Sequence, residues 1–182
     1  PAVALAGDCI PAWEYAIGDP GVGTGYTSSF NAWDDGTGEA LYAAGSFTTA
    51  GGSPASNVAK WDGSSWSALG TNTFNNFATV VESYDGKLYV GGGYSALSGV
   101  PGSAAIAVWD GSSWSDVGGG ITSAIPSVWS MVEYDGKLIV GGNYTEAGGV
   151  AETPYVAAWD GNEWSSVGGG LTGQAGLANA LA

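Results

Sequence analysis

An internal repeat of about 50 residues limits the possible folds of this chain more than any other feature of its sequence. The segment VAKWDGSSWSALG at 58–70 returns as IAVWDGSSWSDVG at 106–118 and as VAAWDGNEWSSVG at 156–168, at intervals of 48 and 50 residues. A second segment, YDGKLYVGG at 84–92, returns as YDGKLIVGG at 134–142. Self-similarity at a fixed interval of this length indicates a structural unit that is built several times and stacked on its neighbours.

Each unit is predicted to contain four strands arranged as two hairpins. Apolar residues alternate along 78–84, and the Asp-Gly pair that follows readily adopts the positive φ angles of a tight hairpin turn. Another apolar stretch at 105–109 is followed by Asp-Gly-Ser, which is typical of a second turn. Two such hairpins form one small twisted sheet, which cannot bury both of its faces without neighbours.

The fold class predicted from these units is all-β, namely a β-propeller with four-stranded antiparallel blades, of which about three and a half are visible. A β-helix repeats in much shorter steps, and helical solenoids lack this turn chemistry. The expected parts are a signal-peptide remnant or disordered N-terminus at 1–6, a partial propeller at 7–182, blade units at about 28–70, 78–118 and 128–168, and partial units at 11–18 and 176–182.

An open run of blades leaves two apolar blade faces exposed. We therefore expect either that the natural polypeptide continues beyond residue 182 or that copies of the chain associate. Cys9 is the only cysteine, and an odd cysteine in a secreted protein predicts a partner outside this sequence.

The blocks G-x-[FY]-[ST]-x-A-G-G and A-x-W-D-G-x-x-W-S-x-[LV]-G resemble those of secreted bacterial repeat proteins with propeller units of roughly 50 residues, which are distantly similar to kelch and WD-repeat proteins. The resemblance covers about residues 11–182. In the second unit Leu97 and Ser98 replace the Ala and Gly of the pattern. The resemblance implies a propeller fold and an extracellular setting, and it carries no shared catalytic residues.

The charge of the chain excludes several classes of function. There are 17 acidic residues against three lysines, with no arginine and no histidine, and the net charge is −14. Nucleic acids and anionic membrane surfaces require clustered basic residues, so neither is an expected partner. Histidine is the usual general base and the commonest metal ligand, so we expect neither an enzyme nor a bound cofactor. No apolar run reaches 18 residues, so no membrane insertion is expected, and Ala4-Leu5-Ala6 resembles the end of a secretory signal. A secreted, extracellular or cell-surface location follows.

Two groups of carboxylates are candidates for chemistry. Glu82 and Glu133 lie on predicted innermost strands, but they stand three and two residues before their turn aspartates. Regular alternation therefore points them to opposite faces, which argues against a glycosidase pair and leaves no catalytic residue. The segment DDGTGE at 34–39 is rich in oxygen atoms and is the one place where Ca²⁺ is considered, although it lacks the ligand spacing of a calcium loop. A lengthened hairpin explains it better.

The tryptophans divide into a repeated set and a single exception. The repeated set is interpreted as structural, because large rings at identical positions fit cross-strand pairs or packing between blades; it comprises Trp61, Trp66, Trp109, Trp114, Trp159 and Trp164. Trp129 lies outside the repeat pattern, at the start of an innermost strand where the preceding unit has Thr79. An exposed ring there suits a sugar or aromatic ligand, and packing into the next blade is the alternative.

Function is expected where the units differ, in the loops opposite the uniform hairpin turns. The candidate ligand-binding residues are Trp129, Phe74, Asn75, Asn76, Phe77 and Tyr155. The amides of the two asparagines suit a carbohydrate, but turn propensity explains them equally. The sequence thus predicts an extracellular, non-catalytic module that binds a glycan or a protein, the alternative being a structural surface protein whose repeats associate with each other.

Overall fold

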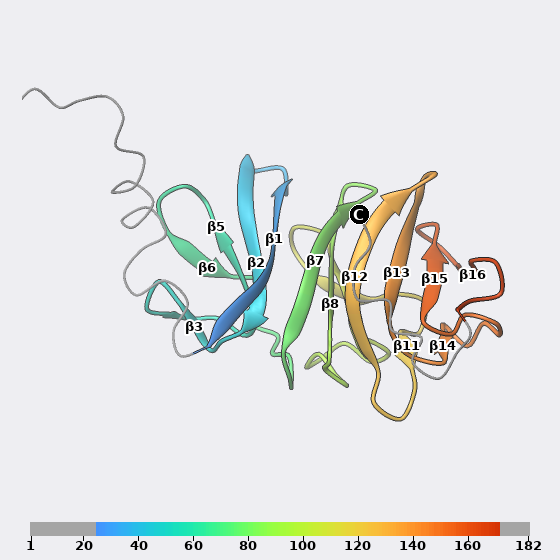
Figure 1. Ribbon diagram of the computed structural model, residues 1–182. Coiled ribbons are helices and arrows are strands. Elements are labelled where there is room, and N and C mark those ends of the chain that lie inside the picture. The colour runs from blue at the N-terminus through green and yellow to red at the C-terminus, as the bar shows by residue number, and fades with distance from the viewer. Residues whose placement is uncertain (1–24, 172–182) are drawn as a thin grey trace, which may run out of the picture.

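The computed structural model describes residues 25–171, and the regular structure of this part of the chain consists entirely of β-strands (Figure 1). The first sheet contains β1 (Tyr26–Asp34), β2 (Glu39–Ser46), β5 (Val58–Trp61) and β6 (Trp66–Ala68). The second contains β7 (Ala78–Tyr84), β8 (Lys87–Gly92), β9 (Ile106–Trp109) and β10 (Trp114–Asp116). The third contains β12 (Ser127–Tyr134), β13 (Lys137–Asn143), β15 (Val156–Trp159) and β16 (Trp164–Ser166).

Each sheet is an antiparallel meander in which strands that follow one another along the chain are paired. Two short strand pairs lie in the loops: β3 (Thr49–Ala50) with β4 (Ser53–Pro54), and β11 (Ile121–Thr122) with β14 (Glu146–Ala147). The predictions of an all-β chain and of four strands in each unit are confirmed. The predicted partial units at 11–18 and 176–182, the N-terminal remnant and Cys9 lie outside the described residues.

The Asp-Gly turns form as the sequence predicts. Asp85 and Gly86 have φ angles of 47° and 69°, and Asp135 and Gly136 have φ angles of 51° and 68°. Positive φ at both central residues is the tight hairpin geometry that matches the twist of the flanking strands. The first sheet has a longer turn at 35–38 in the same place.

The three sheets lie side by side, and their first strands, β1, β7 and β12, contact one another in sequence order (Figure 1); we call these three the innermost strands. One apolar core fills the space between the first and second sheets and includes Tyr42, Leu88 and Trp109. A second core, between the second and third sheets, includes Tyr89 and Leu138. Apolar side chains therefore cover both faces of the middle sheet, which explains how small sheets form a stable structure.

The tryptophans of the repeat form the cross-strand pairs that the sequence predicts. The ring centroids are 5.6 Å apart for Trp61 and Trp66, and 5.2 Å apart both for Trp109 and Trp114 and for Trp159 and Trp164. The last tryptophan of a sheet also reaches the preceding sheet, because the Trp114 indole donates to the Leu69 carbonyl at 2.8 Å and the Trp164 indole to the Val117 carbonyl at 2.9 Å. The pairs of the second and third sheets therefore join neighbouring sheets as well as neighbouring strands.

The innermost strands share an irregularity near their beginning. The register shifts at one extra residue, which is Ser28 in β1, Thr79 in β7 and Trp129 in β12. In the first two sheets the hydroxyl of this residue donates to the next sheet, from Ser28 to the Ala78 carbonyl at 3.2 Å and from Thr79 to the Val128 carbonyl at 2.8 Å. The bulge therefore directs one side chain toward the neighbouring sheet.

The meander order places the two hairpin turns of every sheet at one edge of the molecule and the remaining loops at the opposite edge (Figure 1). We call these the hairpin edge and the loop edge. Within the described residues, none of the structure is a helix of the length and apolarity needed to cross a membrane.

Candidate functional site

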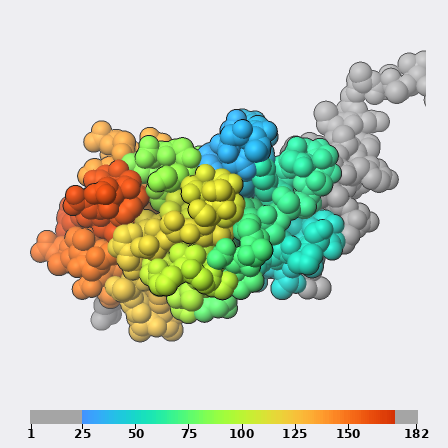
Figure 2. All heavy atoms as spheres, turned by 180° about the vertical axis from the view of Figure 1, so that it is seen from behind, coloured from blue at the N-terminus to red at the C-terminus, as the bar shows by residue number. Residues whose placement is uncertain are grey.

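The loop edge is formed by two kinds of segment. Loops at 47–57, 93–105 and 144–155 join the second and third strands of each sheet, and connectors at 69–77 and 117–126 lead from one sheet to the next. Seen from behind, these segments lie next to one another across the molecular surface (Figure 2). Varied segments on a rigid scaffold are the usual place for binding residues.

Each connector is attached to the loop of the sheet that follows it. Phe74 forms an isolated bridge with Leu97, and the equivalent β11 pairs with β14. The Thr73 carbonyl accepts from the Ser98 amide at 3.0 Å, and the Thr122 carbonyl accepts from the Thr145 amide at 3.1 Å. Because backbone hydrogen bonds hold the connectors, the loop edge is an ordered surface.

A cleft of about 430 Å³ opens between the loop of the first sheet and the connector to the second sheet. None of its lining residues carries a charge; they are Thr48, Pro54, Ala55, Ser56, Ala68, Gly70, Thr71, Asn72 and Thr73. A second hollow of about 370 Å³ is formed by residues 95–103 of the next loop. The first cleft joins two segments that are distant in the sequence, and we take it as the candidate site.

The cleft lies beside a local difference between the units. Residues 47–57 form a loop one residue shorter than residues 94–105 and 144–155. Buried Ser103 and Thr153 close the longer loops, each hydroxyl accepting from the Leu97 or Ala147 amide at 3.0 Å and donating to a nearby carbonyl. The first loop has Ala55 at this position, which has no hydroxyl for the same closure.

The polar groups of the cleft are partly used by the protein and partly available. The Ser56 hydroxyl accepts from the Phe74 amide at 3.1 Å, and the Asn72 amide donates to the Ser98 carbonyl. The side-chain hydroxyls of Thr48 and Thr71 make no hydrogen bond to any part of the chain that the structure describes. Two free hydroxyls beside the apolar surface of Pro54 and Ala55 can therefore orient a small, uncharged, polar ligand.

The predicted binding residues at 74–77 mainly make contacts within the protein. Phe74 is buried and packs edge-on against Tyr94 and Trp114, with ring centroids 4.7 and 5.3 Å away. The Asn75 amide donates to the Ser95 hydroxyl, and its oxygen accepts from the Ser95 and Ala96 amides. These contacts fix the course of the connector, so turn formation and packing explain both residues.

Asn76 and Phe77 complete the same connector. The Asn76 amide donates to the Gly93 carbonyl at 3.2 Å, and its backbone carbonyl accepts from Asn57 at 2.8 Å. Phe77 lies against Gly93, where an added Cβ would be 2.5 Å from the ring. Asn76 therefore joins the loops of the first and second sheets, and Phe77 packs against the loop of the second sheet.

Trp129 and Tyr155 belong to the third sheet and lie apart from this cluster. Trp129 is the bulge residue of β12, half-buried on the inner strand rather than in a loop. Tyr155 has a φ of 66°, and the equivalent Asn57 and Ala105 also have positive values of 63° and 59°. The backbone thus requires an unusual conformation at Tyr155 whichever residue is present, and the six candidate residues do not converge on one pocket.

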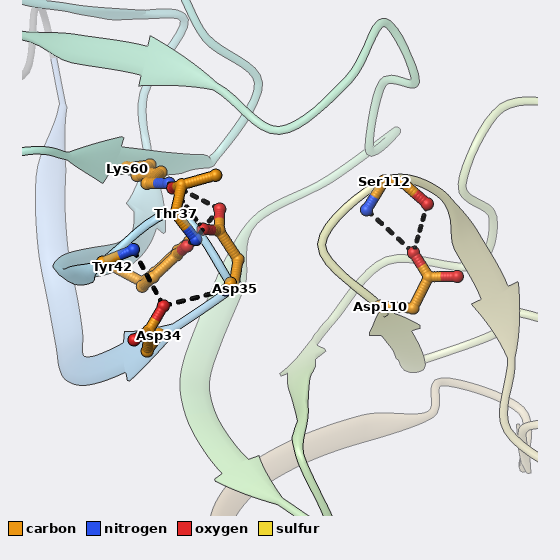
Figure 3. A network of polar contacts seen from close by, with 9 residues as sticks. Asp34, Asp35, Thr37, Tyr42, Lys60, Asp110 and Ser112 are labelled. Carbon is orange, nitrogen blue, oxygen red and sulfur yellow. Dashed lines mark hydrogen bonds and ion pairs between the residues drawn. The ribbon is translucent and has the colours of Figure 1, made fainter.

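The hairpin edge is acidic, and several of its carboxylates accept hydrogen bonds from the protein's own turns (Figure 3). Asp110 accepts from the Ser113 and Ser112 amides at 2.7 and 2.8 Å, and these hydrogen bonds hold the pKa of Asp110 well below its usual range. Asp62 and Asp160 accept the equivalent bonds in their own turns.

The 34–39 turn is held together by its two aspartates. Asp34 accepts from the Gly36 and Gly38 amides at 2.8 and 2.9 Å, and Asp35 forms an ion pair with Lys60. Burial by itself would raise the pKa of Asp35, but hydrogen bonds from Lys60 and Thr37 outweigh it and hold the pKa well below its usual range. Both carboxylates thus have protein partners, and no group of three or more acidic or cysteine side chains among the described residues is placed to hold a metal ion.

Glu82 and Glu133 interact, although they point to opposite faces of their own sheets. Glu82 pairs with Tyr89 on the face of the second sheet toward the third, and Glu133 pairs with Leu138 on the face of the third sheet toward the second. The two carboxylates nevertheless share one junction, because the face of the second sheet toward the third meets the face of the third sheet toward the second. Alternation along a single strand does not show this. Burial is the main cause that raises the pKa of Glu82, and the charge of Glu133 adds to it. Hydrogen bonds from the Ser83 backbone and from the Asn31 side chain act in the opposite direction and lower the pKa.

Sequence reasoning did not single out Thr48, Pro54 or Ser56, which form one wall of the cleft. A signal was present, because the first loop is one residue shorter than its equivalents and lacks their buried hydroxyl. Comparison with known proteins adds no further guide: no protein family matches the chain, and no curated protein is detectably similar to it.

Proposed function

We propose that the three sheets are consecutive blades of a β-propeller and that the chain is an extracellular, non-catalytic module that binds a glycan at its loop edge. The meander order of each sheet and the adjacent innermost strands support the propeller arrangement. An extracellular setting agrees with the resemblance of the repeat to secreted proteins. The ligand class is inferred from the cleft alone, because fold does not determine function.

The observation that carries the proposal is the uncharged cleft between 48–56 and 70–73. A sugar ring presents hydroxyl groups at its rim and C–H groups on its faces, so it needs hydrogen-bonding groups beside apolar surface. The hydroxyls of Thr48 and Thr71 supply the hydrogen-bonding groups, and Pro54 and Ala55 supply the apolar surface. The net charge of −14 disfavours acidic sugars, so a neutral glycan fits best.

A printed array of neutral and sialylated glycans tests the ligand class directly. We expect binding to a subset of neutral glycans and none to their sialylated counterparts. Replacing both Thr48 and Thr71 by valine removes two hydroxyls with little change in shape and is expected to weaken binding about 5- to 150-fold, because each lost hydrogen bond is worth about 0.5–1.5 kcal/mol.

Ser115→Ala is the matched control, because it removes one exposed hydroxyl of β10 outside the cleft. Its glycan binding should equal that of the unmodified chain. An array without any bound glycan would contradict the proposal, as would equal binding by the double valine variant. Capture of a peptide in the same cleft would retain the binding module and replace the ligand class.

A further inference from the structure

The two junctions between sheets are built from the same positions of the repeat. An aromatic residue at the end of the innermost strand is covered by the next sheet: Trp33 in the first sheet and Tyr84 in the second, whose hydroxyl donates to the Gly136 carbonyl at 2.8 Å. At the same junctions, the Leu69 and Val117 carbonyls each accept a hydrogen bond from a tryptophan indole of the next sheet. An established interface therefore occurs twice within the chain.

The third sheet carries the same positions without a described sheet to cover them. Tyr134 is 71% exposed where Tyr84 is 6% exposed, and Val167 is 37% exposed where Val117 is fully buried. Leu171 is 45% exposed where the equivalent Ile121 is fully buried. Exposed apolar side chains that the repeat otherwise buries indicate an unoccupied docking face.

The space around equivalent glycines also shows that the face of the third sheet is uncovered. A Cβ added at Gly118 would lie 2.6 Å from the Trp159 ring, and one added at Gly70 would lie 3.3 Å from the Trp109 ring. At the equivalent Gly168, no described atom lies within 4 Å of the added Cβ. The space that a tryptophan fills in the two internal junctions is open here.

The first sheet presents the complementary face at the other end. Phe30 is 51% exposed, whereas the equivalent Val81 and Met131 are 1% and 5% exposed because they pack against the preceding sheet. Each of the two faces also carries one charged residue, and these two residues have opposite signs. Lys137 pairs with Tyr134 on the outer face of the third sheet, and Glu39 lies on the same face of the first sheet as Phe30.

We propose that a second copy of this chain docks head-to-tail, with the Phe30 face of its first sheet covering the Tyr134 face of the third sheet. The contact continues the interface that already joins the sheets, and it brings apolar residues together with charges of opposite sign. Because the two faces differ, each copy has one of each, and association produces a closed ring or an open chain. The cleft lies at the loop edge, so this proposal is independent of glycan binding.

Light scattering coupled to size-exclusion chromatography tests the association over a range of concentrations of the full chain. We expect a mass of at least two chains, and we expect Phe30→Lys and Tyr134→Lys each to elute as a single chain. Mixing these two variants is the decisive arm, because each retains one intact face. The mixture should form a species of two chains and nothing larger.

Ile125→Lys is the matched control, because this side chain is 74% exposed but lies in a connector outside the junction positions. It should associate like the unmodified chain. Val167→Lys provides a second variant of the Tyr134 face, and circular dichroism checks that every variant is folded. The proposal is overturned if the unmodified chain is monomeric at every concentration, if either face variant still self-associates, or if the mixture stays monomeric.

Discussion

Trp114 is the residue whose replacement best tests how the sheets hold one another. Its indole donates to the Leu69 carbonyl at 2.8 Å, and its ring lies 5.3 Å from Phe74 and 5.2 Å from Trp109. Truncation to alanine removes this packing and leaves a cavity between two sheets, so we expect Trp114→Ala to lower the free energy of unfolding by about 3–5 kcal/mol.

Trp114→Phe separates the hydrogen bond from the packing. Phenylalanine retains a ring but has no N–H, so the Leu69 carbonyl loses this donor in a buried place. We expect this variant to cost about 1–3 kcal/mol. Trp129→Ala is the comparison, because Trp129 is half-buried and outside the tryptophan pairs, and we expect it to cost about 1 kcal/mol or less.

Urea unfolding measures the free energy of unfolding of all three variants. Far-ultraviolet circular dichroism is the probe, because replacing a tryptophan changes the fluorescence signal itself. The midpoints should rank with Trp114→Ala lowest, and the slopes should remain equal if only the folded state has changed. Equal costs for Trp114→Ala and Trp129→Ala would refute the reasoning that the repeated tryptophans carry the packing between sheets.

Three further variants test other contacts. Gly118→Ala should lower the free energy of unfolding in urea by about 1–3 kcal/mol more than Gly168→Ala does. Both glycines have positive φ, but only the Cβ added at Gly118 meets the Trp159 ring, so equal losses would contradict this. Asp35→Asn should destabilise the chain at pH 7, and the difference in melting temperature should shrink as pH falls below about 4, because a lowered pKa gives stability that protonation removes. Glu82→Gln should raise the melting temperature at pH 7 but not at pH 3, because a raised pKa means that the folded state disfavours the charged form; a decrease at pH 7 would refute this.

The sheets could be predicted from the sequence because their determinants are local. An Asp-Gly turn needs only two residues with positive φ, and Asp85 and Gly86 supply them whatever surrounds them. The tryptophan pairs follow in turn, since Trp109 and Trp114 flank a turn of fixed length and must therefore meet across the strands. Repetition of the same pattern then places equivalent residues in equivalent sheets.

The site could not be predicted in the same way, because it depends on contacts between units. The sequence shows Phe74 as an aromatic residue in a variable loop, and only the structure shows Tyr94 and Trp114 packed against it. Alternation along one strand correctly places Glu82 and Glu133 on opposite faces of their own sheets, but it says nothing about the facing sheet, where the charge of Glu133 acts on Glu82. Pairing across a junction is a tertiary property.

The two edges of the molecule differ in how much change they tolerate, and this difference explains why a binding site is expected at one of them. At the hairpin edge the turns of neighbouring sheets touch: a Cβ at Gly111 would lie 3.1 Å from the Asp35 carbonyl oxygen, and one at Gly161 would lie 3.4 Å from Asp85. A turn there contacts the turn of a neighbouring sheet, as the longer 35–38 turn of the first sheet does at Gly111. At the loop edge the 47–57 loop is one residue shorter than its equivalents, yet β2 and β5 remain paired and the cleft lies beside Ala55. A loop that can change length without moving its sheet is the part of this scaffold that can acquire a ligand.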